Sequence, residues 1–371
     1  MLAFKNLQRR PARTLLSLLG VSIGIAAIIA FNAIGQGFRE GINAYLRDSG
    51  AQMVVVNRTM KDPAFSRVTK EEQDFIRGLP EIDHLSRANL ALASPRGLKE
   101  ATRLTMLPVF GRTRGDRLME KYRRGLQGRL PQSDDEILLG SIASEDLKKG
   151  IGDSLELFGR RFTVVGVFRG SAPWEKGGAV MSNAILDEVL QAKNESVYMG
   201  FLYLRPGADP ERVSAAVAGR FPHLEAMKTE EFMNFYDQVE YIDWFVWIIS
   251  LVSVAVGGLG VLNTLLMSVS ERTREIGTLR AVGWSQRRVL RLILAEGVLI
   301  SVLGGLIGLG FGVAGAEILI RFAPMATLST VYGARLFAQA FSVALGLGFL
   351  GSLYPAWRAS RLSPIEALKY E

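Results

Sequence analysis

Four long apolar segments divide this chain of 371 residues. The segments at 15–34, 244–269 and 336–357 contain no charged residue, and the segment at 292–320 contains only Glu296 and Glu317, near its ends. About 20 apolar residues span the hydrocarbon layer of a bilayer, so each segment is long enough to be a transmembrane helix. The pattern predicts an integral membrane α-helical protein with four transmembrane helices.

The 206 residues between the first two segments, Phe38–Asp243, have the mixed pattern of a folded domain outside the membrane. Strands are predicted at 53–56, 137–139, 154–158, 161–168 and 198–204, and helices at 69–79, 141–149 and 209–221. This alternation predicts a large α+β extracytoplasmic domain inserted between transmembrane helices 1 and 2. Helical spacing at Phe38, Ile42, Tyr45 and Leu46, and again over 229–243, predicts two stalk helices that continue the membrane helices.

Local signals set the ends of these predicted elements. Thr69 followed by Glu72 predicts a capped helix start, and Gly150 is expected to close the helix that begins at Ser141. A turn is expected at Gly159-Arg160 between two strands. The stretch 171–178, which contains Trp174, is expected to be a loop, either in contact with a partner or with an ordinary buried tryptophan.

The distribution of charge along the chain predicts its orientation in the membrane. The linker 270–291 has six arginines and two glutamates, and the first 14 residues have four basic residues and no acidic one. Positive charge is retained on the cytoplasmic side, so we expect the N-terminus, this linker and the C-terminus in the cytoplasm. Residues 38–243 balance 29 basic against 30 acidic residues, without a basic, aromatic-rich patch for nucleic acid. The first apolar segment could also be a signal peptide cleaved near Gly35, although its length favours a helix that stays in the membrane.

The predicted boundaries follow from these patterns. They are 1–14 for the cytoplasmic N-terminus, 15–36 for helix 1, 37–243 for the extracytoplasmic domain with its stalks, 244–269 for helix 2, 270–291 for the cytoplasmic linker, 292–320 for helix 3, 321–335 for an external loop, 336–357 for helix 4 and 358–371 for the cytoplasmic tail.

The linker between helices 2 and 3, with the sequence SVSERTREIGTLRAVGWSQRRV, has the pattern of a short docking helix. Thr273 is expected to cap this helix, and Gly283 to end it in a left-handed conformation. Ile276 and Leu279 give it an apolar side, and Ser285 is expected to cap the next membrane helix. Such a helix presents a rigid face to a cytoplasmic partner, although a solvated basic loop is the plainer alternative.

Few other residues are candidates for a site. Gly304, Gly308 and Gly312 share one face of helix 3, which predicts either helix packing or a dimer interface. Glu296 is expected to form an ion pair with Arg291 near the cytoplasmic interface. The chain has no cysteine, its two histidines, at positions 84 and 223, lack metal-ligand spacing, and the acidic run 134–136 fits a solvated turn. No catalytic residue and no metal site are predicted.

Three blocks of this sequence resemble the permease subunits of MacB/LolC/FtsX-type ABC transporters, also called type VII exporters. The blocks are AFKNLQRRPARTLLSLLGVSIGIAAII, EILLGSIASEDLKKGIGDSLELFGRRFTVVGVF, and SERTREIGTLRAVGWSQRRVLRLILAEGVLISVLGGLIG with YPAWRASRLSPIEALKYE. The resemblance implies four transmembrane helices, a MacB-like periplasmic core domain after the first, and a dimer with a second copy or a paralogue. It also implies a bacterial inner-membrane location.

The resemblance further implies that each copy docks a cytoplasmic ABC ATPase, two per dimer, through the linker between helices 2 and 3. The implied ATPase-coupling residues are Glu271, Arg272, Arg274, Glu275, Ile276, Leu279, Arg280 and Gly283, with Ile276 and Leu279 inserting into a groove of the ATPase. The sequence contains no G-x-x-x-x-G-K-[ST] loop, so ATP and Mg are expected in the partner ATPase and no cofactor in this chain.

Three functions are compatible with this reading. The first is ATP-driven export or extraction of an amphipathic substrate, such as a lipid, lipoprotein, peptide or drug, by mechanotransmission. The second is FtsX-like transmembrane signalling that activates a cell-wall hydrolase, which the large external domain disfavours. The third is a membrane hydrolase outside the ABC class, which needs a catalytic group that the sequence patterns do not indicate, since no serine lies in a nucleophile-elbow context. A periplasmic adaptor and an outer-membrane channel are possible further partners.

Overall fold

The computed structural model describes residues 11–58, 66–94, 106–170, 172–190, 197–232, 237–322 and 329–363. Two compact units make up the chain. One combines Met1–Gly35, Asp243–Leu319 and Thr330–Glu371, and the other combines Gln36–Ile242 and Ile320–Ser329. The first is the helical unit and the second is the α/β unit.

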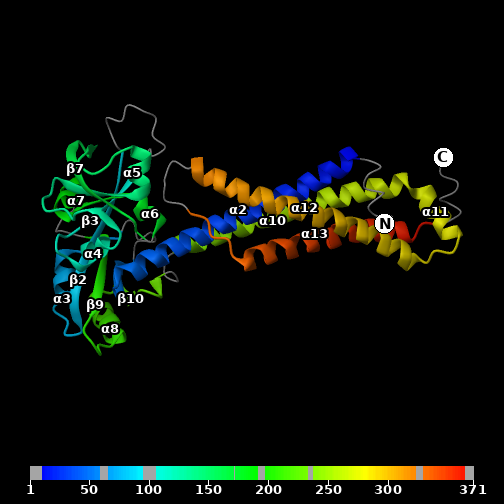
Figure 1. Ribbon diagram of the computed structural model, residues 1–371. Helices are drawn as coiled ribbons and strands as arrows, with labels where there is room; N and C mark the ends of the chain where they lie inside the picture. Colours follow the sequence, from blue (N-terminus) through cyan, green and yellow to red (C-terminus); the bar gives the residue numbers. More distant parts are fainter. Residues whose placement is uncertain are drawn as a thin grey trace. The chain divides into compact units, whose positions relative to one another are not determined.

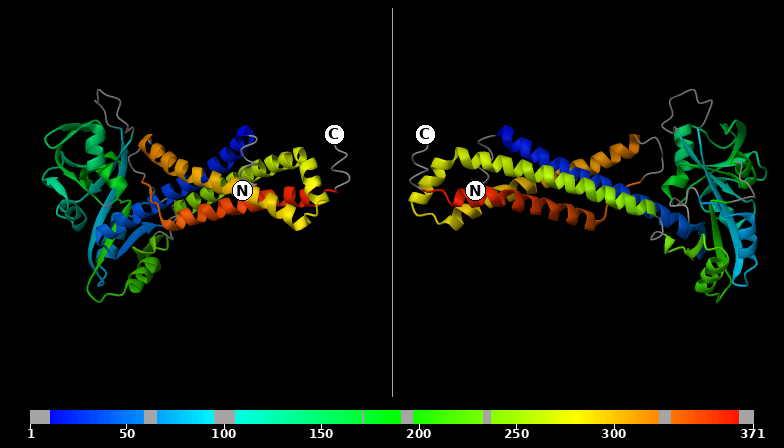
Figure 2. Two further views of the ribbon diagram at one scale, coloured as in Figure 1. Left: turned by 45° about the vertical axis from the view of Figure 1, so that its right-hand side comes forward. Right: turned by 180° about the vertical axis from the view of Figure 1, so that it is seen from behind.

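The helical unit contains four long helices that run alongside one another in every view (Figures 1 and 2). Their bounds are Pro11–Ser49 for α2, Asp237–Glu271 for α10, Gln286–Phe322 for α12 and Ala334–Ser360 for α13. Each is long and apolar enough to cross a membrane. The short helix α11, Thr273–Ala281, follows α10. The predicted four transmembrane helices are therefore confirmed.

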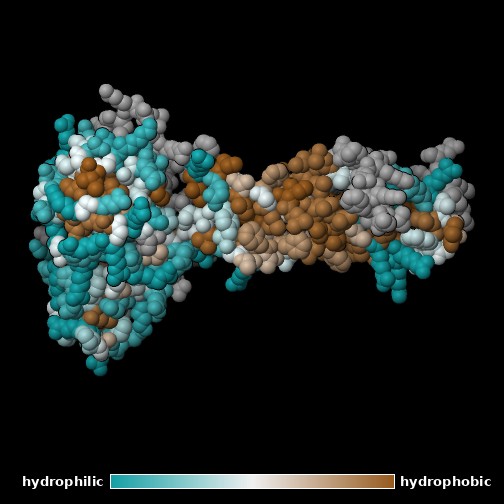
Figure 3. Space-filling model, viewed as in Figure 1, coloured by the Kyte–Doolittle hydropathy of each residue, from teal (hydrophilic) through white to brown (hydrophobic). Residues whose placement is uncertain are grey.

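The outer surface of the helical unit is apolar, as contact with lipid tails requires. Figure 3 shows hydrophobic residues gathered in a continuous band over the long helices. The exposed large side chains on α10 include Trp244, Phe245, Trp247, Ile248, Leu251, Val252, Val256 and Leu259. Burying such residues in hydrocarbon instead of water is favourable by about 1.5–3 kcal/mol for each side chain.

The glycine stripe of α12 packs against α2 of the same chain. A Cβ atom at Gly308 would lie 2.7 Å from the Ser22 carbonyl oxygen, and one at Gly312 would lie 2.8 Å from Cβ of Ile29. Gly304 is similarly close to Val21, and its carbonyl oxygen accepts a hydrogen bond from Ser22 Oγ at 2.9 Å. Because the glycines have no side chains, the two backbones approach closely, and this face of α12 is occupied within the chain.

The α/β unit is built on one ten-stranded sheet with the strand order β10-β1-β9-β2-β3-β8-β5-β7-β4, in which β6 also pairs with β7. The strands are β1 Met53–Asn57, β2 Ile82–Ala93, β3 Leu107–Arg112, β4 Leu126–Gly128, β5 Glu136–Gly140, β6 Ser154–Leu157, β7 Arg160–Phe168, β8 Ala179–Ser182, β9 Met199–Leu204 and β10 Leu224–Lys228. The helices are α3 Lys70–Arg77, α4 Arg117–Glu120, the 3-10 turn η2 Lys121–Arg123, α5 Ser141–Leu147, α6 Pro173–Lys176, α7 Asn183–Val189 and α8 Pro210–Arg220. This arrangement confirms a large domain of helices and strands between the first and second membrane helices.

The long strand β2 joins two lobes of this sheet. Its first part, Ile82–Ala88, pairs with β9, and its second part, Asn89–Ala93, pairs with β3. One lobe therefore contains β1, β9 and β10 with α3 and α8, and the other contains β3 to β8 with α5 and α7.

Strand β1 shows how the first lobe is covered on both faces. Met53 and Val55 pack in the core beneath α3 and α8, whereas Val54 and Val56 pack in the core that includes the end of α2. Successive side chains of a strand point to opposite faces, so a run of four fully buried apolar residues requires a layer on each side. The C-terminal part of α2 provides one of these layers.

Several local predictions are confirmed. Thr69 caps α3 through a capping box, in which its hydroxyl accepts from the amide of Glu72 and the Glu72 carboxylate accepts from the amide of Thr69 at 2.7 Å. The expected periodic stalk residues Ile42, Tyr45 and Leu46 are buried within the continuous helix α2. The second expected stalk covers 229–243. Within it, residues 233–236 lie outside the described residues, and helix α10 begins at Asp237.

Three local predictions differ from the structure. Helix α5 ends at Leu147, and its C-cap Lys148 is in the left-handed conformation, two residues before the expected stop at Gly150. The turn between β6 and β7 consists of Phe158 and Gly159, both with positive φ, because Leu157 pairs directly with Arg160. The expected loop 171–178 contains the short helix α6.

A substitution in the glycine stripe tests the close contact between α12 and α2. We expect Gly308→Val to lower the stability of the helical unit by about 1–3 kcal/mol, because the added atoms overlap the α2 backbone. Gly310→Val is the matched control, since a Cβ atom at Gly310 meets nothing within 4 Å. Thermal unfolding in lipid nanodiscs measures both variants, and equal melting temperatures for the two would contradict the packing described here.

Candidate functional site

The linker between α10 and α12 is a structured element. Helix α10 ends at Glu271, Arg272 leaves the helical conformation, and α11 begins at Thr273. The expected cap at Thr273 is not formed, because its hydroxyl donates back to the carbonyl oxygens of Val269 and Ser270 at 3.2 and 2.8 Å. The start of α11 is thus bonded to the last turn of α10.

The C-terminus of α11 has the predicted glycine stop. Gly283 has a φ of 98°, its amide donates to Arg280, and the amide of Trp284 donates to Leu279. These two bonds form the Schellman motif, which favours glycine at the left-handed position. Arg280 Nη1 also donates to the Trp284 carbonyl at 3.0 Å, which further fixes the turn. Helix α12 begins directly after Ser285.

The apolar side of α11 faces the chain's own helices. Ile276 is only 1% exposed and packs in a cluster with Val269, Val289, Ile293, Ala356 and Ala359, which come from α10, α12 and α13. Ile276 is therefore unavailable for insertion into a partner, contrary to the expectation from the sequence. Its burial instead fixes α11 to the ends of three membrane helices.

A buried ion pair also holds α11 in place. Glu296 of α12 is 2% exposed, and Arg272 Nη1 donates to its two carboxylate oxygens at 3.0 and 3.3 Å. The sequence suggested Arg291 as the partner, whereas the structure brings Arg272 of the linker to this carboxylate. Arg272 Nε also donates to Glu275 at 3.1 Å, so one guanidinium joins α11 to α12. An ionised carboxylate is costly to bury without such a partner.

The opposite face of α11 is exposed. Arg274, Glu275 and Thr278 lie on the surface, as does Glu271 at the end of α10, while Leu279 and Arg280 are only partly exposed. Val282, at the end of the helix, is a large apolar side chain that is 79% exposed. Figure 1 shows α11 at the turn between α10 and α12. Val282 was not among the sequence candidates, although Arg274, Thr278 and Val282 recur at four-residue spacing.

The remaining sequence candidates do not join this site. Gly304, Gly308 and Gly312 lie along α12 against α2. In the α/β unit, His84 Nε2 lies 3.0 Å from Asp116 and His223 Nε2 lies 2.6 Å from Glu72. Arg129 and Arg114 pair with Glu136 and Asp134 of the acidic run. Within the described residues, no group of three metal-ligating side chains occurs.

The α/β unit contains a buried charge cluster that the sequence analysis missed. Glu175 of α6 is fully buried, and its Oε1 accepts from Tyr122 Oη at 2.6 Å and lies 2.8 Å from Lys121 Nζ. Arg112, also fully buried, lies 3.9 Å from Glu175 and donates to Tyr45 Oη at 2.9 Å. Tyr45 belongs to α2, so this helix is bonded to the cluster.

Burial shifts the pKa values of two side chains in the cluster. It lowers the pKa of Lys121, although the carboxylate of Glu175 acts in the opposite direction. Burial also raises the pKa of Tyr122 well above its ordinary value, which keeps this hydroxyl protonated as a donor. The two cations and one carboxylate thus form a buried ion cluster between α2, β3, η2 and α6, with the hydroxyls of Tyr45 and Tyr122 hydrogen-bonded to Arg112 and Glu175.

Four helices able to cross a membrane, an α/β domain after the first, and a helical linker fixed to the helix ends define a membrane permease. The MacB-like periplasmic core domain family matches residues 14–220, and the FtsX-like permease C-terminal family matches residues 247–364. The first match covers more than half of the chain. The chain belongs to the MacB/FtsX-type family of ABC transporter permeases.

Similar proteins extend over nearly the whole chain. The macrolide export ATP-binding/permease protein MacB of Bdellovibrio bacteriovorus is 27% identical over 99% of this chain and 61% of its own length. The pyoverdine export ATP-binding/permease protein PvdT of Pseudomonas syringae pv. tomato is 28% identical over 97% of this chain and 57% of its own length. The chain thus spans about three fifths of these relatives.

Solved structures are also similar to this chain, as one example shows. The periplasmic region of MacB from Actinobacillus actinomycetemcomitans has a TM-score of 0.40 and 11% identity, over 52% of this chain and 95% of that one.

The Arg272–Glu296 pair can be tested by removing one partner and then both. We expect Arg272→Leu to destabilise the protein by about 3–5 kcal/mol, because it leaves the Glu296 carboxylate buried without its partner. The double variant Arg272→Leu, Glu296→Leu should regain most of this loss. Thermal unfolding of the unchanged chain, Arg272→Leu and the double variant measures these differences, and a double variant less stable than Arg272→Leu would contradict the pairing.

The charge cluster gives a second stability test. Glu175→Leu should cost about 3–5 kcal/mol, because Arg112 and Lys121 then remain buried without a counter-charge. Glu188→Leu removes a glutamate whose side chain is 61% exposed and paired with Arg160, and should cost about 0–1 kcal/mol. Similar melting temperatures for both variants would show that the buried carboxylate is not needed.

Proposed function

We propose that this chain is the permease subunit of an ATP-driven transporter whose ATPase is a separate cytoplasmic chain that docks on α11. The observation that carries the proposal is the two-sided character of this helix. One side is fixed to α10, α12 and α13 by Ile276 and by the Arg272–Glu296 pair. The other side exposes charged residues and Val282. A helix held in this way can pass a displacement of its partner to the membrane helices.

The docking surface differs from the one expected from sequence. Glu271, Arg274, Glu275, Thr278 and Val282 form the proposed contact, with Val282 as its apolar residue. Leu279 and Arg280 border it, whereas Arg272 and Gly283 act by holding α11 in place. The two glutamates and Arg274 would set the orientation of the ATPase through complementary charges.

The proposed cycle is mechanical. Two ATPases, which bind ATP and Mg, close on each other and move the α11 helices of two permease chains, either two copies or a copy and a paralogue. Helices α2 and α10 have no proline after Pro11, unlike α13, which contains Pro355. At 1.5 Å per residue, α2 is about 58 Å long, which exceeds a hydrocarbon layer of about 30 Å. Such a helix can carry movement into the α/β unit.

Export of an amphipathic substrate from the periplasm or outer leaflet is the function favoured over signalling. The MacB-like family matches the α/β domain, whereas the FtsX-like family matches only residues 247–364. The names of the MacB and PvdT relatives describe export of a macrolide and of pyoverdine. We place the N- and C-termini and α11 in the cytoplasm, and an adaptor with an outer-membrane channel remains compatible with this arrangement.

A pull-down tests the docking surface. The tagged chain is purified from its native membrane in mild detergent, and the retained proteins are identified by mass spectrometry. We expect a P-loop ATPase at near one-to-one ratio, and roughly tenfold less of it with Val282→Asp. Ile151→Asp, at an apolar position of the α/β unit that is 53% exposed, is the matched control and should retain the ATPase.

Two results would overturn the proposal. One is the absence of any ATPase from an intact preparation. The other is equal retention by Val282→Asp and by the unchanged chain, which would remove α11 as the docking surface.

A further inference from the structure

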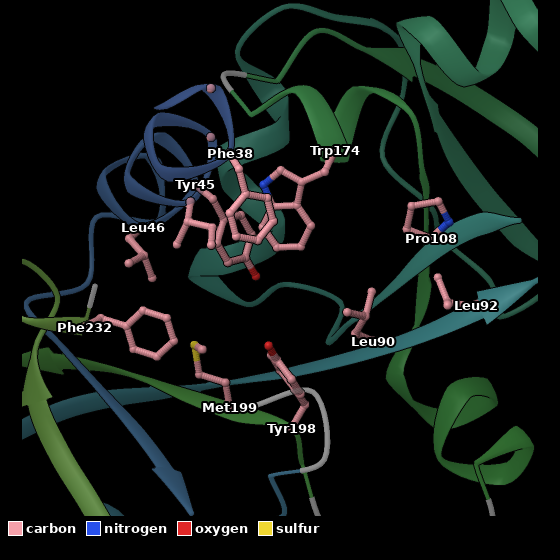
Figure 4. Close-up of a pocket in the computed structure, with 13 residues that line it drawn as sticks. Phe38, Tyr45, Leu46, Leu90, Leu92, Pro108, Trp174, Tyr198, Met199 and Phe232 are labelled. Atoms are coloured by element: carbon pink, nitrogen blue, oxygen red, sulfur yellow. The ribbon is translucent and has the colours of Figure 1, made fainter. Parts of the chain in front are cut away.

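The α/β unit contains an apolar cavity beside the C-terminal part of α2, with a volume of about 220 Å³. Helix α2 forms one wall with Phe38, Ile42 and Tyr45, and Trp174 of α6 stands next to it (Figure 4). Met199 of β9 and Leu90 of β2 lie across the space. The cavity thus lies between α2, α6 and the central part of the sheet.

The lining has the chemistry of a site for an apolar group. It includes five aromatic side chains, Phe38, Tyr45, Trp174, Tyr198 and Phe232, together with aliphatic residues and Met199. An apolar cavity of roughly 150 Å³ stays dry and binds benzene, so this larger one has room for more than a single ring. Met199 is flexible and polarisable, which suits a surface that adapts to different ligands.

The polar atoms at this cavity are few. Tyr45 Oη already accepts from Arg112, so the tyrosine presents mainly its ring. Trp174 Nε1 is enclosed and has no hydrogen-bond partner among the described residues. The ring of Trp174 packs edge-on against Tyr45 and Phe110, with centroids 4.7 and 5.2 Å apart, which holds the indole in place. The wall is therefore preorganised, and a ligand is bound by burial of its apolar surface.

The rim also favours an amphipathic occupant. Leu92 lines the cavity and is 52% exposed, so the apolar surface continues from the interior to solvent. A wholly apolar molecule would fit the interior equally well but would not account for an open, exposed rim. An amphiphile can bury its apolar part inside and leave its polar part in water.

We propose that this cavity binds the apolar portion of an amphipathic small molecule, with an acyl chain of medium length as its simplest form. Calling this molecule a substrate rests on the proposed function, whereas the binding site itself does not. Because α2 forms one wall, a shift of α2 relative to the sheet would change the shape of the cavity. Binding and release of the apolar portion would then follow the movement of this helix.

Trp174 is the only tryptophan of residues 38–243, which makes the test specific. The other four tryptophans, Trp244, Trp247, Trp284 and Trp357, are replaced by phenylalanine in the full chain. This protein is placed in lipid nanodiscs and titrated with 11-bromoundecanoate, whose bromine quenches an indole on contact. We expect saturable quenching of Trp174, which unbrominated undecanoate relieves by competition.

A cavity-filling variant supplies the matched comparison. A Cβ atom at Gly41 would lie 3.6 Å from Pro173 and 3.8 Å from Trp174, which are ordinary contacts, so Gly41→Leu adds its outer atoms to the cavity without a backbone clash. We expect roughly a tenfold or greater rise in the half-saturating concentration of the probe. Gly219→Leu, on α8 with nothing within 4 Å, should change it by less than about twofold.

The outcomes distinguish binding of the probe in the cavity from its partition into the bilayer. They also test the cavity independently of the proposed function. Leu90→Phe fills the cavity from the sheet and replaces Gly41→Leu if that variant does not fold. Absence of saturable quenching, or equal quenching in the filled variants, would overturn the proposal, as would quenching of Trp174 by brominated phospholipid alone. The ATPase pull-down uses the same chain, so saturable quenching without a retained ATPase would preserve the cavity and reject the transporter.

Discussion

The carboxylate of Glu296 lies inside a membrane helix, and the need to pair it determines how the linker is built. Glu296 has almost no contact with solvent, so its charge must be balanced by a cation that can reach it. Arg272 does this from the break between α10 and α11, and it also contacts Glu275. The position of α11 therefore depends on an interaction of Arg272, the residue just before it, and the burial of Ile276 continues the attachment along the helix.

The α/β unit has a corresponding constraint at the end of α2. Glu175, Arg112 and Lys121 are removed from water, so the two cations depend on the carboxylate of Glu175 as their counter-charge. Tyr45 contributes its hydroxyl to Arg112 and its ring to Lys121, whose Nζ lies 4.4 Å from the ring centroid. Apolar packing alone would tolerate a sliding helix, whereas a hydrogen bond to a buried guanidinium fixes its position. The proposed mechanical coupling requires such a connection.

Sequence patterns predicted the parts of this fold that depend on neighbouring residues. The four apolar segments, the capping box at Thr69 and the glycine stop at Gly283 each need only a few adjacent positions. Contacts between distant residues were not predictable in this way. Arg272 and Glu296 are 24 residues apart, and Arg291 is nearer in sequence to Glu296. Glu175 and Arg112 resembled ordinary polar residues, because their burial follows only from the assembled sheet.

The apolar side of α11 shows why the docking residues were assigned differently. A short amphipathic helix has one apolar stripe, and the sequence does not state whether the stripe faces its own bundle or a partner. Ile276 faces the bundle, and this placement leaves the charged face and Val282 exposed for the proposed partner. A docking surface that is mainly polar can separate and rebind more readily than an apolar one, because its free form is already well solvated. Stable attachment on one side and a polar contact on the other would suit the proposed role of α11, in which the helix stays with its membrane unit while the proposed ATPase moves.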